Sequence, residues 1–172
     1  MPFIEVPDAD CANLERVFSL RPEVYTAWRE LVTAVKATSD ERRYELATLA
    51  AARRLRSSYC SLAHGKLLAE QFYDFDSVPA FPDGLDEADR AIMAFAEQVV
   101  ADATSITQAD VDELRAHGLS DGEIFDIVLA ATIRCFFSKT LDALGVQPDA
   151  EFAELDPAFR EPLTVGRPIE TA

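Results

Sequence analysis

Apolar residues recur at helical spacing along most of this chain, and this periodicity constrains its fold more than any other feature. The segment 121–144 shows the pattern most clearly. Ser120-Asp121-Gly122-Glu123 forms a capping box, the run that follows is apolar on most sides, and Gly145 ends it. We find no segment with the alternation of apolar and polar residues that indicates a β-strand. The sequence therefore predicts an all-α fold.

Helix-start residues divide the rest of the chain into further helices. In chain order, the helix starts are Pro22, Asp40, Ser57 or Ser58, the residues after the break at 79–84, and Thr107. The helix after Asp40 is expected to run through Arg56, and Gly118 is expected to end the short helix after Thr107. The helix that begins at Pro22 carries an apolar stripe made of Val24, Trp28, Leu31 and Val35.

The chain has 172 residues, which is enough for one domain with a sizeable core. We expect a single domain over 1–172, with its core at about 20–150 and an N-terminal segment over 1–19. The last residues, 151–172, are rich in proline. We interpret them as a tail or as an arm that packs on a neighbouring subunit.

Charge and cysteine content exclude several classes of function. Sixteen basic against 31 acidic residues give a net charge of −15, which argues against nucleic acid and anionic membranes as partners. No uncharged apolar run is long enough to cross a bilayer. Three cysteines do not form a secreted disulfide framework, and the first residues do not resemble a signal peptide. We therefore expect a cytoplasmic protein.

The segment 45–64 holds an acid, a thiol and an imidazole among mostly apolar residues. Cys60 and His64 are four residues apart, so they share one face of a helix. Cys60 lies in the first helical turn, where free N–H groups and the helix dipole favour a thiolate. Basic residues also crowd this part of an acidic chain: Arg42, Arg43, Arg53, Arg54, Arg56 and Lys66. Cys60 is therefore the candidate nucleophile.

Each of these residues also has a structural interpretation. Cys60 could be a buried apolar residue, and His64 could be a half-buried histidine that forms ordinary hydrogen bonds. Glu45 could form a salt bridge with a nearby arginine, or it could orient His64 and relay a proton. Cys135 is expected in the core. Cys11 could reach Cys60 of the same or another subunit only if the N-terminal region folds across the site.

No cofactor or metal is expected from the sequence. Two histidines and scattered cysteines lack ligand spacing, and His117 is expected at the surface where a short helix ends. The chain has no glycine-rich loop of the kind that binds phosphate, and it has no Ser–His–Asp signature.

The order Glu, then Cys-x-x-Cys-x-x-x-His, is the pattern of the alkylhydroperoxidase AhpD and carboxymuconolactone decarboxylase superfamily. Glu45, Cys60 and His64 fall on this pattern, and Ser57 stands at the first cysteine. The segments 114–124 and 136–146 are similar to the family's connection into its last long helix and to the end of that helix. The resemblance covers about residues 20–150, and it implies an AhpD-like bundle of about six to eight helices.

The resemblance also implies a function. Cys60 would attack the peroxide as nucleophile, with His64 and Glu45 as its catalytic partners. Ser57, at the resolving position, cannot form a disulfide, so the chain would act as a single-cysteine hydroperoxide reductase that an external thiol discharges. Tyr59 would join the proton relay or serve only in packing. Relatives form dimers, trimers or hexamers, so a homo-oligomer is implied.

Two alternatives stay open at this point. One is a cofactor-free decarboxylase or lyase of the carboxymuconolactone type, in which His64 and Glu45 move a proton on an organic acid. The other is a non-catalytic oligomeric relative.

Overall fold

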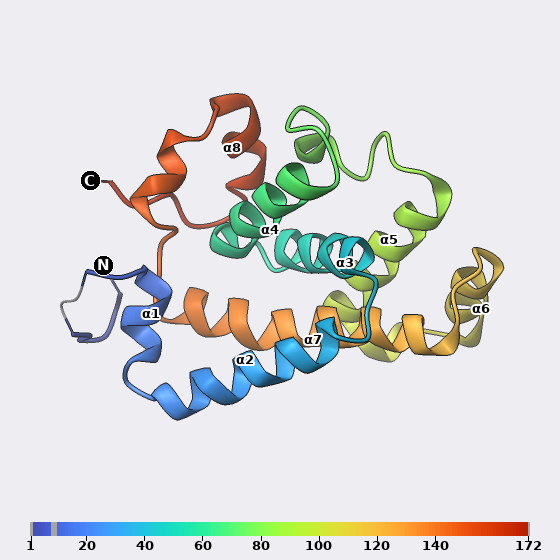
Figure 1. Ribbon diagram of the computed structural model, residues 1–172, viewed down its shortest axis with the longest axis horizontal. Coiled ribbons are helices and arrows are strands. Elements are labelled where there is room, and N and C mark those ends of the chain that lie inside the picture. Colours follow the sequence, from blue (N-terminus) through green and yellow to red (C-terminus); the bar gives the residue numbers. More distant parts are fainter. Residues whose placement is uncertain (1, 8–9, 172) are drawn as a thin grey trace.

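The computed structural model describes residues 2–7 and 10–171, and within them the chain is helical with no β-strand (Figure 1). The all-α prediction is confirmed. The α-helices of the described residues are α1 (Asn13–Phe18), α2 (Pro22–Lys36), α3 (Glu41–Arg54), α4 (Ser58–Gln71), α5 (Glu87–Asp102), α6 (Gln108–Ala116), α7 (Asp121–Ala143) and α8 (Pro157–Leu163). The short 3₁₀ helices there are η1 (Val78–Ala80), η2 (Ala103–Ser105) and η3 (Ala150–Glu154).

Helix α3 lies at the centre of the bundle and packs against α4, α5 and α7. The long α7 runs along one side, and α2 lies beside it (Figure 1). Leu46 and Leu49 of α3 are completely buried. Truncating such a leucine to alanine costs about 2–5 kcal/mol of stability, because it removes apolar contacts and leaves a cavity. The α3 helix that carries Glu45 is therefore held rigidly.

The capping signals place the helix starts correctly. The Asp40 side chain accepts a hydrogen bond from the Arg43 N–H, and capping boxes begin α6 and α7. Helix α3 ends at Arg54, two residues before the predicted end, because Arg56 adopts a left-handed conformation with φ of 57°. The Ser57 N–H then donates to the Ala52 carbonyl, which closes a Schellman motif.

The apolar stripe predicted for α2 is only partly buried. Val35 is buried, but Val24 and Leu31 are 41% and 49% exposed. The reason is that α2 meets the bundle mainly along α7, and no helix of the described chain covers its outer edge.

The proline-rich segment packs on its own chain. Helix α8 contacts α4 and η1, and Leu163 is completely buried. A Cβ added to Gly65 would lie 2.7 Å from Leu163 Cδ1, so α4 and α8 approach each other as closely as a glycine allows. This segment, expected as a tail or an arm on a neighbour, completes the packing around α4.

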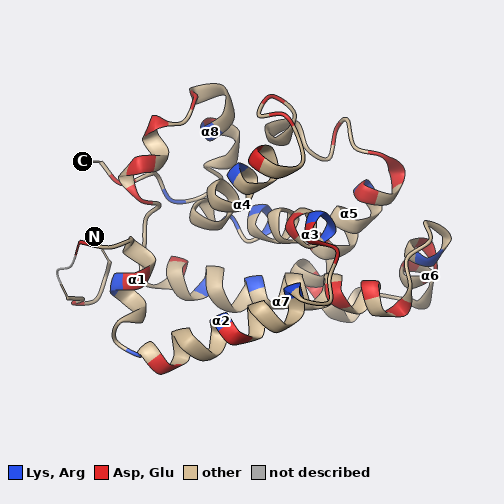
Figure 2. Cartoon of the chain, viewed as in Figure 1, with Lys and Arg blue, Asp and Glu red and all other residues tan. Residues whose placement is uncertain are grey.

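Basic and acidic residues are unevenly distributed (Figure 2). Basic residues occur on α3, α4 and α7, whereas acidic residues predominate on the outer turns and on α6. Within the described residues, none of the helices combines the length and the apolar character that a membrane span requires.

Candidate functional site

A short helical hairpin positions Cys60. Helix α3 turns into α4 through Leu55, Arg56 and Ser57, and Ser57 is the N-cap residue of α4. The first backbone hydrogen bond of α4 runs from the Ser61 N–H to the Ser57 carbonyl. Cys60 therefore lies at the third helical position, where the backbone N–H has no partner within the helix. The first turn of a helix carries a partial positive charge, and Cys60 lies within that turn of α4.

A buried guanidinium reinforces that field. Arg134 of α7 is 2% exposed, and its Nη1 donates a hydrogen bond to Cys60 Sγ over 3.3 Å. The same guanidinium lies over the Phe137 ring, 5.4 Å from the ring centroid. Within the described chain, Arg134 forms no ion pair with a carboxylate. Its charge is therefore available to the sulfur or to a bound anion.

The Glu45 carboxylate joins α2, α3 and α4. Oε2 lies 2.5 Å from His64 Nδ1, and Oε1 accepts a hydrogen bond from Lys36 Nζ over 2.8 Å. Burial acts to raise the pKa of Glu45, but the interactions with His64 and Lys36 outweigh it and lower the pKa from 4.5 to about 2. Glu45 therefore contacts His64, as orientation of that ring would require, and it also forms a salt bridge, with Lys36 in place of the expected arginine.

His64 is placed to act as a neutral base. Burial lowers the pKa of His64, and the positive charge of Arg134 lowers it further, against the opposing pull of Glu45. At neutral pH the ring is therefore uncharged. We assign the Nδ1 proton to the hydrogen bond with Glu45, which leaves Nε2 as the acceptor.

Cys60 and His64 line one cavity of about 210 Å³ between α1, α2, α3, α4 and α7. Its walls are Leu14, Tyr25, Trp28, Val32, Lys36, Tyr44, Glu45, Tyr59, Cys60, Ala63, His64, Arg134 and Phe137. The rings of Tyr25, Trp28 and Phe137 stack in sequence, with 4.2 Å between the centroids of Trp28 and Phe137. Sites for drug-sized ligands are about 300–1,000 Å³, so this cavity suits a small molecule.

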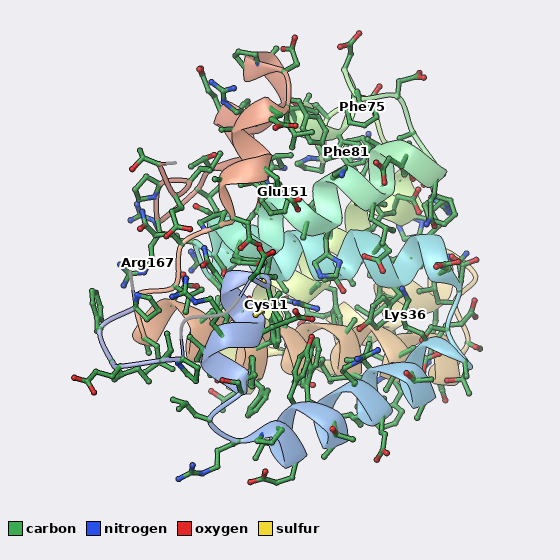
Figure 3. All side chains as sticks on the ribbon, turned by 60° about the vertical axis from the view of Figure 1, so that its left-hand side comes forward. Cys11, Lys36, Phe75, Phe81, Glu151 and Arg167 are labelled. Carbon is green, nitrogen blue, oxygen red and sulfur yellow. The ribbon has the colours of Figure 1, made fainter. Side chains whose placement is uncertain are left out.

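Figure 3 shows the side of the molecule on which α1, α2 and α4 converge. Lys36 lies between α2 and α3, where it meets Glu45, and Cys11 lies at the end of α1 that faces α4. Cys60 itself is only 1% exposed. A reactant must therefore enter the cavity to reach its sulfur.

The two further residues of the predicted site lie beside Cys60. Tyr59 lines the cavity, but its hydroxyl donates to the Asp149 carboxylate, and burial together with this hydrogen bond raises the pKa of Tyr59 well above its usual value. Ser57 is completely buried. Burial raises the pKa of Asp142, and the Ser57 hydroxyl partly offsets that effect.

The other candidates of the sequence lie away from the cavity walls. Cys135, expected in the core, is half-buried on α7, and burial raises its pKa. His117 is the C-cap residue of α6 and is partly exposed. Within residues 2–7 and 10–171, no three or more His, Cys, Asp and Glu side chains gather as metal ligands would.

Sequence reasoning missed Arg134 and Lys36 as parts of the site. Arg134 carried a recognisable signal, because it is the single charged residue in the otherwise apolar stretch 127–137. A charge there must be paired or functional. Lys36 carried no comparable signal, since a lysine in the last turn of an amphipathic helix is ordinary.

Comparison with protein-family models gives no match, and comparison with curated proteins gives none either. Solved structures do match. An uncharacterized peroxidase-related protein from Ralstonia eutropha JMP134, described as an alkylhydroperoxidase AhpD core, is 20% identical with a TM-score of 0.77. The match covers 88% of this chain and 94% of that one.

Two further structures are similar. An uncharacterized peroxidase-related protein from Silicibacter sp. TM1040 is 21% identical with a TM-score of 0.67, over 82% of this chain and 78% of that one. The debrominase Bmp8, in a cysteine-to-alanine variant bound to 2,3,4-tribromopyrrole, is 18% identical with a TM-score of 0.72, over 87% of this chain and 81% of that one. Identities this low establish the fold alone. The chain therefore adopts the AhpD-like fold that its Glu45, Cys60 and His64 pattern predicts.

Proposed function

We propose that this protein is a hydroperoxide reductase of the AhpD and carboxymuconolactone decarboxylase superfamily that acts through the single cysteine Cys60. The observation that carries the proposal is the hydrogen bond from buried Arg134 to Cys60 Sγ, at 3.3 Å, in the cavity that His64 also lines. A thiolate is the nucleophilic form of cysteine, and Arg134 places a cationic hydrogen-bond donor beside the sulfur. Three free cysteines fit the reducing cytoplasm that we propose as its setting.

The first half-reaction oxidises Cys60 and reduces the peroxide. The thiolate attacks the terminal oxygen of ROOH, the O–O bond breaks, and an S–O bond forms. The leaving alkoxide takes a proton and departs as an alcohol, while Cys60 becomes a sulfenic acid. His64 accepts the thiol proton at Nε2 and returns it to the alkoxide, and Glu45 holds the ring in the required tautomer.

The second half-reaction regenerates the thiol. An external thiol attacks the sulfenic acid, water leaves, and a mixed disulfide forms. A second external thiol then releases Cys60 as a thiol and leaves as a disulfide with the first. Ser57 has no sulfur, so it cannot attack the Cys60 sulfenic acid in place of the first external thiol.

A second function deserves a test because Arg134 has no carboxylate partner within the described chain. A buried guanidinium of this kind could bind the carboxylate of an organic acid. The Glu45–His64 pair would then move a proton on that acid, as in a cofactor-free decarboxylase or lyase, and the Cys60 thiol would be incidental. A non-catalytic relative would show neither reaction.

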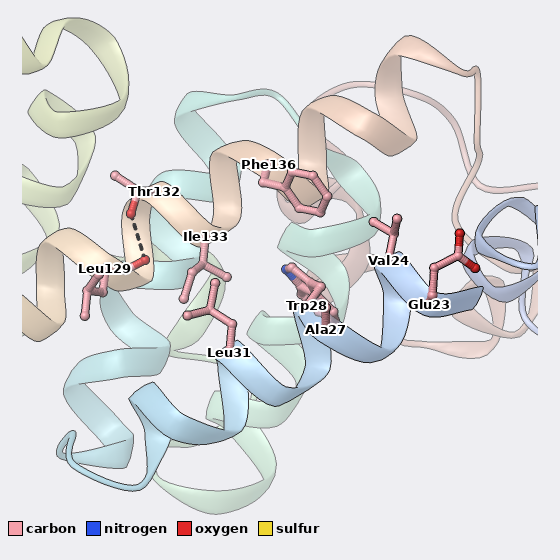
Figure 4. A pocket seen from close by; sticks show the side chains of 9 residues that line it. All are labelled: Glu23, Val24, Ala27, Trp28, Leu31, Leu129, Thr132, Ile133 and Phe136. Carbon is pink, nitrogen blue, oxygen red and sulfur yellow. Dashed lines mark hydrogen bonds between the residues drawn. The ribbon is translucent and has the colours of Figure 1, made fainter. Parts of the chain in front are cut away.

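We also propose that the protein is a homo-oligomer through the groove between α2 and α7 (Figure 4). The groove measures about 570 Å³ and its lining holds one charged residue, Glu23. On α7, residues 125, 129, 132 and 136 follow the spacing of a helix-pairing stripe, and Phe125 and Phe136 are 60% and 46% exposed. Two copies with a net charge of −15 each repel one another over most of their surface, so a face with a single charged residue is where they can meet. Trp28 lines both this groove and the Cys60 cavity.

The test of the proposed function is peroxide consumption with a panel of monothiol and dithiol reductants. We expect hydrogen peroxide or a small alkyl hydroperoxide to be consumed by the native protein and not by Cys60→Ser. An organic acid and a brominated pyrrole complete the substrate panel, the second because a debrominase shares this fold. Turnover of the organic acid by Cys60→Ser, without peroxide consumption by the native protein, would instead establish the proton-transfer function.

A further inference from the structure

The first turn of α1 reaches the Cys60 cavity, and Cys11 lies just before that turn. Leu14, in the first turn of α1, lines the same cavity as Cys60 and packs in the same apolar cluster. Cys11 lies three residues before Leu14, so their Cα atoms are at most about 11 Å apart even in a fully extended chain. Cys11 is an exposed free thiol and lies outside helix α1.

The Asp149 carboxylate connects the start of α1 to Tyr59, the residue before Cys60. Asp149 Oδ1 accepts a hydrogen bond from the Asn13 backbone N–H over 2.7 Å, and its Oδ2 accepts one from the Tyr59 hydroxyl. Asn13 is two residues after Cys11, and Tyr59 immediately precedes Cys60. Figure 3 shows Cys11 at the N-terminal end of α1, the end at which the Asn13 N–H donates to Asp149. The N-terminal region thus folds against the site, which was the condition for a Cys11–Cys60 encounter.

The remaining thiol does not share this placement. Cys135 is half-buried on α7 and does not line the cavity, although its neighbour Arg134 does. Consecutive helical residues point in different directions, so the contact of Arg134 with Cys60 does not bring the Cys135 sulfur into the cavity.

We propose that Cys11 resolves oxidised Cys60, so that the chain closes an intramolecular Cys11–Cys60 disulfide where Ser57 cannot supply one. This inference rests on the proposed peroxide reaction at Cys60, and it replaces the attack of the first external thiol on the sulfenic acid by the attack of Cys11. The Cys11 thiolate attacks the sulfur of the Cys60 sulfenic acid, the S–O bond breaks, an S–S bond forms, and the oxygen leaves as water after taking up a proton. A dithiol reductant then exchanges with the disulfide, which restores both cysteines and oxidises the dithiol.

A disulfide requires the exposed Cys11 to meet the buried Cys60. Disulfide-bonded cysteines have Cα atoms about 4.4–6.8 Å apart. Cys11 lies N-terminal to the hydrogen bonds at Asn13, so it can approach Cys60 without unfolding α1. Once formed, the bond would cover the cavity and protect Cys60 from further oxidation to a sulfinic acid.

The test counts thiols after one equivalent of hydrogen peroxide, with a cyclic 1,3-dione present to trap any sulfenic acid. We expect the native protein to lose two thiols per chain and to yield a Cys11–Cys60 cross-linked peptide in non-reducing mass spectrometry. Cys11→Ser should lose one thiol per chain, a twofold smaller change, and should carry the dione adduct on Cys60. Cys135→Ser is the matched control and should behave as the native protein does.

The outcomes separate this inference from the proposed function. Loss of one thiol with a dione adduct on Cys60 in the native protein would overturn the role of Cys11 and leave the peroxide reaction standing. A disulfide found only between chains on a non-reducing gel would overturn the intramolecular closure. Cys60 left reduced in both the native protein and Cys11→Ser would refute the peroxide reaction itself.

Discussion

Replacing Arg134 by methionine should separate reactivity from stability. The substitution removes the guanidinium whose Nη1 lies 3.3 Å from Cys60 Sγ and keeps a long, flexible apolar side chain. A hydrogen bond to a charged group is worth about 1.5–3 kcal/mol. At 1.36 kcal/mol for each tenfold, its loss should slow the reaction of Cys60 about 10- to 150-fold. An unscreened charge pair 4 Å apart in a medium of dielectric about 20 gives about 4 kcal/mol, which bounds this figure from above.

Stability should respond in the opposite sense. Arg134 is 2% exposed and forms no ion pair within the described chain, so its burial costs solvation free energy that only the sulfur and the Phe137 ring offset. Apolar replacements of buried charges are often neutral or stabilising. We therefore expect the melting temperature of Arg134→Met to be unchanged or higher than that of the native protein.

The assay is alkylation of Cys60 by iodoacetamide at pH 7, followed by peptide mass spectrometry, together with peroxide consumption by the same samples. Arg54→Met is the control, because Arg54 is an exposed arginine at the end of α3. The alkylation rate of Cys60 in Arg54→Met should differ less than twofold from that in the native protein, as expected for a screened surface charge. An Arg134→Met variant that is folded and reacts as fast as the control would refute the assigned role of the guanidinium.

Four further predictions follow from the site and the surface. His64→Gln should slow the alkylation of Cys60, which peptide mass spectrometry measures. In the native protein, the lowered pKa keeps His64 neutral, so peroxide consumption should persist through pH 6.5 and fall only at lower pH in a stopped-flow pH profile. Glu45→Gln should lower the free energy of unfolding at pH 7 by about 1–3 kcal/mol. Because the pKa of Glu45 is lowered from 4.5 to about 2, its contribution is present above pH 4.5 and is lost as the pH falls toward 2, so urea titrations of the two proteins should converge in acid. Phe136→Glu should dissociate the proposed oligomer in light scattering, and a native protein that is already monomeric at micromolar concentration would contradict the assembly. Ser57→Cys should form a disulfide with Cys60 after peroxide treatment and support turnover with a dithiol; an introduced thiol that stays free by mass spectrometry would contradict this.

The fold could be predicted because its determinants are local. Asp40, Thr107 and Ser120 begin helices in the structure as their capping chemistry indicates. The burial of α2 could not be predicted in the same way, since Val24 and Leu31 of its apolar stripe lie at the surface. An apolar stripe indicates that burial of one helix face is favourable, but it does not indicate whether the same chain or another one buries that face.

The local part of the site could also be predicted. Cys60 and His64 share a face of one helix, and the hairpin brings Glu45 to His64. Arg134 comes from a helix 74 residues away, and no local pattern encodes that approach. The link from Asp149 to Asn13 and Tyr59 is equally non-local, and the course of the N-terminal segment depends on it.

The most direct test of the central claim is residue-resolved mass spectrometry during peroxide titration of the native protein. Of the three thiols, Cys60 accepts the hydrogen bond from Arg134 and lines the cavity with His64, whereas Cys11 and Cys135 do not line it. The account predicts that Cys60 oxidises first, at substoichiometric peroxide, either as a trapped sulfenic acid or within a disulfide. Oxidation of Cys11 and Cys135 while Cys60 stays reduced would contradict it.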